Sequence, residues 1–267
     1  MSTVSVLCRE TEGVNEGSSK IITLDGFHAW KHAARFGASI DRVFTDDLAG
    51  IDELIEQLAP DLANLVKECI EVVSAVELGR LAGEQGLKSV HHTRLLAVAR
   101  QPENRGVTQR TTARNGRCVV FVDHPRHLGN LGAVIRAVAG AGGAGVLTLG
   151  DVDPWHAGVV RASAGTHFAV DVARLNDTEV ASLDGPIFGL DADGENLFTC
   201  NIPAGSVIAV GAERAGLSPA IRKRVDKLVA LPMRAGVSSL NLATSVAAAL
   251  YVIESSNHLK SSESETP

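Results

Sequence analysis

Five short apolar runs, each followed by a loop of small or polar residues, constrain the carboxyl-terminal half of this sequence. They are Cys118–Val122, Val146–Leu149, Ile187–Leu190, Val207–Gly211 and Leu228–Leu231. Unbroken apolar runs of this length are typical of strands that are covered on both faces. Helices are predicted at Leu131–Ala141, Pro219–Val225 and Leu240–Glu254. The pattern predicts a parallel, doubly wound α/β sheet, whose ligands bind beyond the carboxyl ends of the strands.

The amino-terminal half repeats the alternation of strands and helices on a smaller scale. Strands are predicted at Ile21–Leu24, Ile40–Thr45, Ile70–Val73 and Leu95–Ala99, and helices at Phe27–Phe36, Ile51–Leu58 and Ala75–Ala82. Residues 20–102 are therefore predicted to form a small α/β domain. A polar linker at 103–116 leads to the larger domain at 117–254. Residues 1–19 and 255–267 show little apolar pattern and are predicted to be disordered tails.

Charge is distributed unevenly along the chain. The net charge of −6 argues against a general binder of polyanions. Between Lys88 and Arg117, however, seven basic residues stand against one acid, Glu103, which gives this stretch a net charge of +6. The stretch is either a solvated charged linker or a strip that faces nucleic-acid phosphates. On the second interpretation, the candidate contacts are Arg105, Arg110 and Arg114.

The sequence also disfavours several other classes of protein. No apolar run reaches the roughly 18–20 residues that cross a bilayer, and the acidic start does not resemble a secretion signal. We therefore expect a soluble protein of the cytoplasm. The four cysteines are far apart and lack metal-ligand spacing, so we expect reduced thiols and no metal site.

The first of three loop motifs follows the strand Cys118–Val122 and opens a helix. It contains Asn130, and the helix behind it carries an apolar stripe at intervals of three and four residues. Arg136 is the only charged residue between Leu128 and Gly150. An arginine in so apolar a helix needs a partner or a purpose. It is either one half of a buried ion pair, with Glu213 as the candidate partner, or a binder of phosphate.

The second and third motifs also follow strands directly. The segment from Gly211 to Ser218 carries Glu213 among small residues that let a ligand approach the backbone. The segment from Leu231 to Asn241 ends in a serine pair that can cap a helix. Capping by a serine does not explain Asn241, a residue of low helix propensity in the predicted first turn.

A further glycine-rich segment, Gly140–Gly145, matches the G-x-G-x-x-G spacing of dinucleotide-binding proteins. That fingerprint must follow a strand and open a helix. Here it ends a helix and precedes a strand, so the glycines are better explained as a helix stop. An oxidoreductase with a nucleotide cofactor is therefore a weak alternative.

Taken together and in this order, the three loops resemble the signature motifs of the SpoU (TrmH) family of the SPOUT methyltransferases. The resemblance covers about residues 117–254. The matching residues are Asn130-Leu131-Gly132 with Arg136, Gly211-Ala212-Glu213-Arg214-Ala215-Gly216-Leu217, and Leu231-Pro232-Met233 with Ser239-Leu240-Asn241. The segment Arg161–Gly165 resembles a weaker family element. The departures from the family pattern, such as Ala212 and Leu231, remove no side chain that is expected to do chemistry.

The resemblance implies an α/β fold with a deep trefoil knot, which sequence reasoning alone would not propose because knots are nearly absent from proteins. It implies S-adenosylmethionine as cofactor, a homodimer, and a small amino-terminal RNA-binding domain. Cofactor contacts then fall at Leu190, Gly211, Leu231, Met233 and Leu240. The candidate catalytic residues are Arg136, Asn130, Glu213, Ser239 and Asn241.

The implied reaction is the methylation of an RNA ribose 2′-hydroxyl, with ribosomal RNA favoured over transfer RNA. Because the guanidinium pKa is about 12.5–13.8, Arg136 is expected to bind phosphate and stabilise developing charge rather than act as a simple base. The alternatives are a transfer-RNA 2′-O-methyltransferase and a non-catalytic RNA-binding factor on the same fold. The combined presence of the candidate catalytic residues argues against the second alternative.

Overall fold

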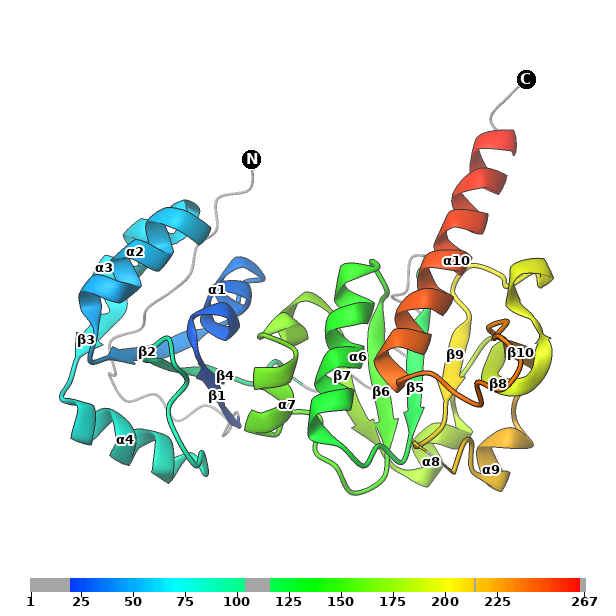
Figure 1. The fold of residues 1–267 in the computed structure, drawn as a ribbon, viewed down its shortest axis with the longest axis horizontal. Coiled ribbons are helices and arrows are strands. Elements are labelled where there is room, and N and C mark those ends of the chain that lie inside the picture. The colour runs from blue at the N-terminus through cyan, green and yellow to red at the C-terminus, as the bar shows by residue number, and fades with distance from the viewer. Residues whose placement is uncertain (1–19, 104–115, 214, 265–267) are drawn as a thin grey trace. The chain divides into compact units, whose positions relative to one another are not determined.

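The computed structural model describes residues 20–103, 116–213 and 215–264, which form two compact units (Figure 1). The first unit contains the described residues up to Glu103 together with Trp155–Ala169. The second contains Gly116 to Pro154 and the described residues from Val170 onward. The segment Trp155–Ala169 was predicted to belong to the larger domain, whereas it packs with the smaller one.

The first unit is built on a mixed four-stranded sheet of order β1-β4-β2-β3. Strand β4 is antiparallel to both of its neighbours, and β2 and β3 are parallel. Its strands are β1 (Ile21–Asp25), β2 (Ile40–Thr45), β3 (Ile70–Val72) and β4 (Leu95–Arg100). Its helices are α1 (Phe27–Arg35), α2 (Leu48–Leu58), η1 (Pro60–Leu62), α3 (Ala63–Cys69), α4 (Ala75–Glu84), α7 (Ala157–Ala162) and η2 (Thr166–Ala169). The predicted strands and the three predicted helices of this half are confirmed to within a few residues.

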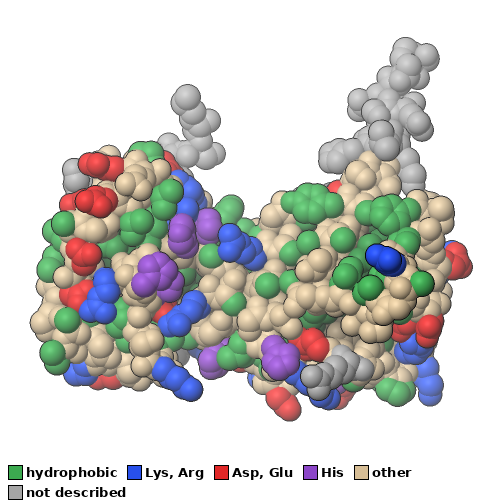
Figure 2. Space-filling view, in the orientation of Figure 1, with side chains coloured by type: hydrophobic (Ala, Val, Ile, Leu, Met, Phe, Trp, Pro, Cys, Tyr) green, Lys and Arg blue, Asp and Glu red, His purple; other side chains and the backbone are tan. Residues whose placement is uncertain are grey.

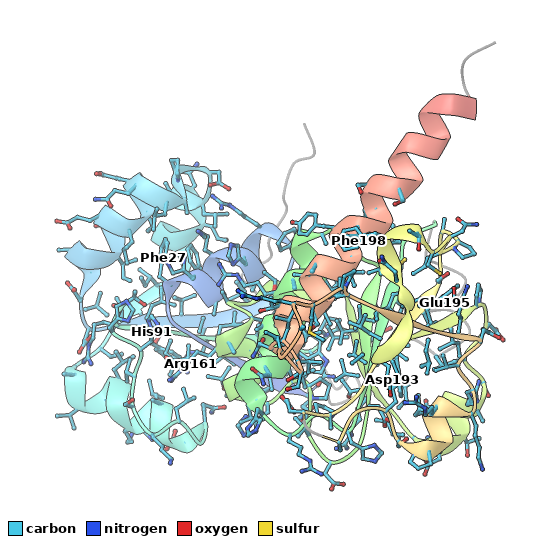
Figure 3. All side chains as sticks on the ribbon, turned by 45° about the vertical axis from the view of Figure 1, so that its right-hand side comes forward. Phe27, His91, Arg161, Asp193, Glu195 and Phe198 are labelled. Atoms are coloured by element: carbon cyan, nitrogen blue, oxygen red, sulfur yellow. The ribbon has the colours of Figure 1, made fainter. Side chains whose placement is uncertain are left out.

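The segment Trp155–Ala169 joins the first unit through a buried charge. The carboxylate of Asp25, at the end of β1, accepts hydrogen bonds from the guanidinium of Arg161 and from the backbone N–H of His91. Figure 3 labels both of these residues. Gly165 lies against α1 so closely that a Cβ there would be 2.1 Å from the carbonyl oxygen of Ala29. A buried carboxylate with a charged partner and a glycine contact therefore hold the segment in place.

The second unit contains a six-stranded sheet of order β10-β8-β9-β5-β6-β7, and every pair in it is parallel. Its strands are β5 (Val119–Asp123), β6 (Gly145–Leu149), β7 (Asp171–Leu175), β8 (Ile187–Asn196), β9 (Val207–Val210) and β10 (Lys227–Ala230). Its helices are α6 (Leu128–Gly140), α8 (Asp177–Ala181), η3 (Leu197–Thr199), α9 (Pro219–Arg222) and α10 (Leu242–Ser264). The predicted parallel α/β sheet is confirmed.

Helix α6 packs on this sheet through its predicted apolar stripe. Leu131, Val134, Ile135 and Val138 are fully buried, and each such side chain contributes about 1.5–3 kcal/mol relative to exposure. The helix ends at Gly140, and Gly142 follows with a φ of 76° that favours glycine. The segment Gly140–Gly145 therefore ends the helix, as predicted, and is not a phosphate-binding turn.

The second unit also departs from the prediction in its sheet and at its carboxyl end. Strand β7 was missed because Asp171 and Arg174 interrupt its apolar pattern, which an edge strand tolerates. Strand β8 extends past its predicted end, and Gly194 allows this because a Cβ there would lie 2.5 Å from the backbone of Val229. Helix α10 reaches Ser264, so the prediction of a disordered tail from residue 255 was wrong for residues 255–264. Neither glycine nor proline interrupts the helix before Pro267.

Three further observations concern membranes, metals and thiols. No helix in the described part of the chain is both long and apolar enough to cross a membrane. The described residues also contain no group of three or more histidine, cysteine or acidic side chains arranged to hold a metal ion. Cys118 and Cys200 are free, whereas Cys69 is disulfide-bonded, so the expectation of reduced thiols was wrong for Cys69.

Candidate active site

A cavity of about 640 Å³ lies beside the middle of β8 and at the carboxyl ends of β9 and β10. Its walls are formed by residues of β8, by the loops after β9 and β10, and by the start of α10. It is lined by Leu190, Asp191, Ala192, Val210, Gly211, Ala212, Glu213, Ala215, Gly216, Leu231, Met233, Ser238, Ser239, Leu240, Asn241, Leu242 and Ser245. All five residues expected to contact a cofactor are in this set, as are Glu213, Ser239 and Asn241 among the expected catalytic residues.

The loop after β9 turns back on itself beside the cavity. Ala212 and Gly216 form an isolated antiparallel bridge, and the N–H of Gly216 donates to the carbonyl of Ala212 at 3.0 Å. A Cβ at Gly211 would lie 1.9 Å from the carbonyl carbon of Gly216. Only glycine fits at Gly211, and the tight turn projects Glu213 toward the cavity.

A chain of hydrogen bonds joins the three sequence motifs. The side-chain amide of Asn241 donates to the side-chain oxygen of Asn130 at 3.1 Å, and the amide of Asn130 donates to Oε1 of Glu213 at 2.6 Å. Oε2 of Glu213 is buried, and no described residue donates a hydrogen bond to it. Because a buried carboxylate oxygen without a donor is costly, this atom is a candidate acceptor for a ligand.

Asn241 also begins helix α10. Its side-chain oxygen accepts hydrogen bonds from the backbone N–H groups of Ala243 and Thr244, at 3.0 and 3.4 Å. The prediction of a cap at Ser238 or Ser239 was therefore wrong, and so was the placement of Asn241 inside the first turn. Asparagine is among the best N-cap residues, and its amide remains free to hold Asn130.

Arg136 does not form the buried ion pair that the sequence analysis considered. Its side chain is exposed on α6, and among the described residues Glu213 is held by Asn130 instead. The reason is helical periodicity: Arg136 lies off the stripe formed by Val134, Ile135 and Val138, so its charge stays in water. The distribution of charge along the chain does not reveal the position of Arg136 around the helix. The phosphate-binding interpretation of Arg136 remains a prediction.

The third motif lines the cavity with polar and apolar side chains that are accessible to solvent. Ser239 is exposed, Leu240 is 45% exposed, and Leu231 and Met233 are only partly covered. Large apolar side chains exposed around a cavity are suited to a flat, partly apolar ligand. The three arginines expected to contact RNA, Arg105, Arg110 and Arg114, lie outside the described residues.

One charged lining residue, Asp191, was not predicted from the sequence. Asp191 directly follows the predicted strand Ile187–Leu190. It could have been predicted, because ligands of parallel α/β sheets bind beyond the carboxyl ends of the strands. Its carboxylate pairs with Arg222 at 2.5 Å and accepts the N–H of Asp193 at 3.0 Å. Farther along β8 and η3 lie Asp193, Glu195 and Phe198, which Figure 3 labels. The pairing with Arg222 fixes the Asp191 side of the cavity wall.

The second unit is thus a parallel α/β domain with a cavity at the carboxyl edge of its sheet, where three distant segments are joined by polar side chains. A model of the SpoU rRNA methylase family matches residues 117–251. The chain belongs to this family.

Relatives and solved structures agree with this assignment. A protein of Archaeoglobus fulgidus, named an uncharacterized tRNA/rRNA methyltransferase, is 31% identical over 144 residues, which are 52% of this chain and 64% of that protein. The 23S rRNA (uridine(2479)-2′-O)-methyltransferase of Streptomyces viridochromogenes is 27% identical over 206 residues, 72% of this chain and 71% of that protein.

The crystal structure of the SpoU methyltransferase AviRb from Streptomyces viridochromogenes, in complex with the cofactor AdoMet, shares the fold. Its TM-score is 0.70 at 22% identity, with 89% of this chain and 90% of that chain covered. The chain spans less than two thirds of the length of the first curated relatives it matches, 64% in one case and 45% in others.

Proposed function

We propose that the protein is an S-adenosylmethionine-dependent RNA 2′-O-ribose methyltransferase. The observation that carries this proposal is the hydrogen-bond chain from Asn241 through Asn130 to Glu213 beside the cavity. Three segments that are distant in sequence supply these side chains, and each belongs to one of the family's motifs. A chain that only needed to fold would not require all three polar residues at one cavity.

The residues present fit the proposed cofactor. The absence of a Cβ at Gly211 keeps the β9 loop tight, and the partly exposed Leu231, Met233 and Leu240 offer apolar surfaces for an adenine ring. The buried Oε2 of Glu213 is an acceptor for a cationic or hydroxyl group. When bound, S-adenosylmethionine supplies the electrophilic methyl group of its sulfonium, so the reaction needs no metal.

The chain's own residues then have the task of placing the ribose and managing its proton. Asn130 and Asn241 hold the carboxylate of Glu213 in one orientation, which lets its free oxygen position a ribose or cofactor hydroxyl. The exposed guanidinium of Arg136 binds the phosphate next to the target ribose and stabilises the alkoxide charge that develops there. Ser239 completes the polar side of the pocket.

Ribosomal RNA is the proposed substrate, and transfer RNA is the alternative. The 23S rRNA methyltransferase of Streptomyces viridochromogenes supports the first choice because its match extends over 72% of this chain and thus beyond the carboxyl-terminal half. The small α/β unit is the proposed RNA-binding domain, at residues 20–102. Arg105, Arg110 and Arg114 are proposed to contact phosphates, and the proposed site of action is the cytoplasm.

A homodimer with the catalytic domains in contact is also proposed. Large hydrophobic side chains are exposed on the second unit, among them Tyr251 of α10 at 60% and Phe198 of η3 at 63%. Figure 2 shows hydrophobic side chains, in green, at the surface of this unit. Helix α10 and η3 contact each other, and contiguous exposed apolar groups mark surfaces that pack on a partner. Light scattering at micromolar concentration should give the mass of a dimer, and a monomer would contradict the proposal. The trefoil knot remains part of the proposed fold.

Two measurements test the proposed activity. Calorimetry should detect S-adenosylhomocysteine binding without added metal, and transfer of a labelled methyl group to ribosomal RNA should give 2′-O-methylated nucleotides. No binding at millimolar ligand would reject the methyltransferase. Cofactor binding without transfer to any ribosomal or transfer RNA would favour the alternative of a non-catalytic RNA-binding factor.

A further inference from the structure

The loop between β5 and α6 carries a buried acid whose two oxygens are both engaged. Asp123, the last residue of β5, is 1% exposed. Its Oδ1 lies 2.6 Å from Nδ1 of His124, and its Oδ2 accepts the backbone N–H of Ser218 at 2.6 Å. The carboxylate therefore fixes the imidazole through one oxygen and the end of the Glu213 loop through the other.

The backbone of His124 has an uncommon conformation. Its φ of 50° lies in the left-handed region that non-glycine residues seldom adopt. Opposite it, Gly150 has a φ of 111°, and a Cβ there would lie 3.0 Å from Cδ2 of His124. The His124 side chain is nevertheless 56% exposed. Because Asp123 engages Nδ1, the remaining ring nitrogen, Nε2, is available to an external partner.

Beyond the buried Pro125, the loop continues with two exposed basic residues. Arg126 and His127 are both exposed, and no described residue forms an ion pair with Arg126. Helix α6 begins directly after His127, and its Asn130 holds Glu213. The loop is thus joined to the proposed active site on two sides, through Asp123 and Ser218 and through Asn130 and Glu213.

We propose that the loop His124–His127 contacts the sugar–phosphate backbone of the substrate RNA, with His124 as an oriented hydrogen-bonding group and Arg126 as a phosphate-binding cation. This inference rests on the proposed function and names a contact surface for it. A role limited to the turn requires the Asp123 carboxylate but gives no reason for an exposed imidazole and an exposed arginine on the same four residues. Backbone contacts of this kind position RNA without reading its sequence.

The test compares single variants with a charge-matched control. His124→Gln and Arg126→Gln are titrated with a fluorescein-labelled single-stranded RNA, and anisotropy is recorded between about 50 and about 200 mM salt. Lys227→Gln, at the amino end of β10 on the opposite edge of the same sheet, is the control for lost charge. Each loop variant should weaken RNA binding several-fold, and Arg126→Gln should reduce the salt slope by about 1. The control should bind like the wild type.

Cofactor binding separates this inference from the proposed function. Both loop variants should retain wild-type affinity for S-adenosylhomocysteine, which also shows that they are folded. Wild-type RNA affinity and salt slope in both loop variants would overturn the inference while leaving the methyltransferase intact. The same loss in Lys227→Gln as in Arg126→Gln would overturn it as well, because net charge alone would then explain the effect. Failure of the wild type to bind S-adenosylhomocysteine would instead contradict the proposed function.

Discussion

The two units are both α/β, but their sheets organise polar side chains in different ways. In the mixed sheet of the first unit, β4 runs opposite to β1, β2 and β3, so the chain after β4 leaves at the other edge from the loops after those three strands. In the second unit all strands are parallel, and the loops after β5, β8, β9 and β10 leave at one edge. A parallel sheet can therefore gather distant motifs at one cavity.

The units also differ in how their charged groups are used. In the first unit, Arg35, Arg42 and Arg94 each form an ion pair, with Asp61, Glu71 and Asp46 respectively. In the second, Arg136 has no ion-pair partner among the described residues, and neither has the buried Oε2 of Glu213. Ion pairs such as those of the first unit stabilise a fold, whereas the unpartnered Oε2 of Glu213 lines the cavity and is a candidate acceptor for a ligand.

The largest expected effect follows from replacing the exposed arginine of α6. Arg136→Ala should reduce the single-turnover rate of methylation by about 10²-fold or more, as the loss of an electrostatic transition-state contact does. Affinity for S-adenosylhomocysteine should be unchanged, since the expected cofactor contacts are on other loops. Arg42→Ala, an exposed arginine paired with Glu71 in the first unit, is the matched control and should methylate normally. A wild-type rate in Arg136→Ala would contradict the proposed role.

Two tightly packed glycines should respond differently to the same change. Gly211→Ala should weaken S-adenosylhomocysteine binding by about 10- to 100-fold, because overpacking of about 1–3 kcal/mol falls on the cavity loop. Gly165→Ala, which meets Ala29 in the first unit, should lower thermal stability by a similar free energy but spare cofactor affinity in the folded protein. Gly140→Ala, with no atom near its added Cβ, should change neither property. Calorimetry and thermal melts distinguish these outcomes.

A smaller effect is expected from the basic stretch between the two halves of the sequence. Neutralising Arg105, Arg110 and Arg114 together should weaken RNA binding by about tenfold and flatten its salt dependence, since fewer counterions are released. The single-turnover rate at saturating RNA should stay near that of the wild type. If affinity and salt slope both persist, these arginines belong to a solvated linker.

The smallest effect concerns the ion pairs of the first unit in acid. Hydrogen bonds from Arg94 and Arg35 hold the pKa values of Asp46 and Asp61 below their usual range. A lowered folded-state pKa contributes stability above the unfolded value of 3.8, and this stability is lost as the pH falls through the folded value. Asp46→Asn should therefore cost about 0.2–1 kcal/mol at neutral pH and less in acid. A cost that does not decrease in acid unfolding curves would contradict the ion pair as its source.

Much of the second unit could be predicted because local pattern and fold agree there. The apolar runs became parallel strands, the stripe on α6 is buried, and every expected cofactor contact lines the cavity. The exposure of Arg136 was not predicted because its neighbours in the sequence are apolar. The environment of a helical side chain depends on its angle around the helix and not on these neighbours. Strand β7 was missed because an edge strand need not be apolar throughout.

Other features depend on contacts between residues that are distant in sequence. Asn241 caps helix α10 and also donates a hydrogen bond to Asn130, which is 111 residues away in the sequence. No local sequence pattern includes both residues. The pairing of Asp123 with Ser218 spans 95 residues. In the first unit, the contact between Asp25 and Arg161 spans 136. Propensity and periodicity cannot supply such pairs, since they describe only neighbours along the chain.

The discontinuous first unit has a consequence for the order of folding during synthesis. Domains generally form as units while the chain emerges from the ribosome, amino-terminal parts first. Here the buried carboxylate of Asp25 must wait for Arg161, by which time β5, α6 and β6 have already been made. The first unit is therefore completed only after synthesis of the second has started. A nascent chain halted at Glu103 should be cleaved by a protease, whereas a nascent chain that extends past Ala169 should resist the same protease.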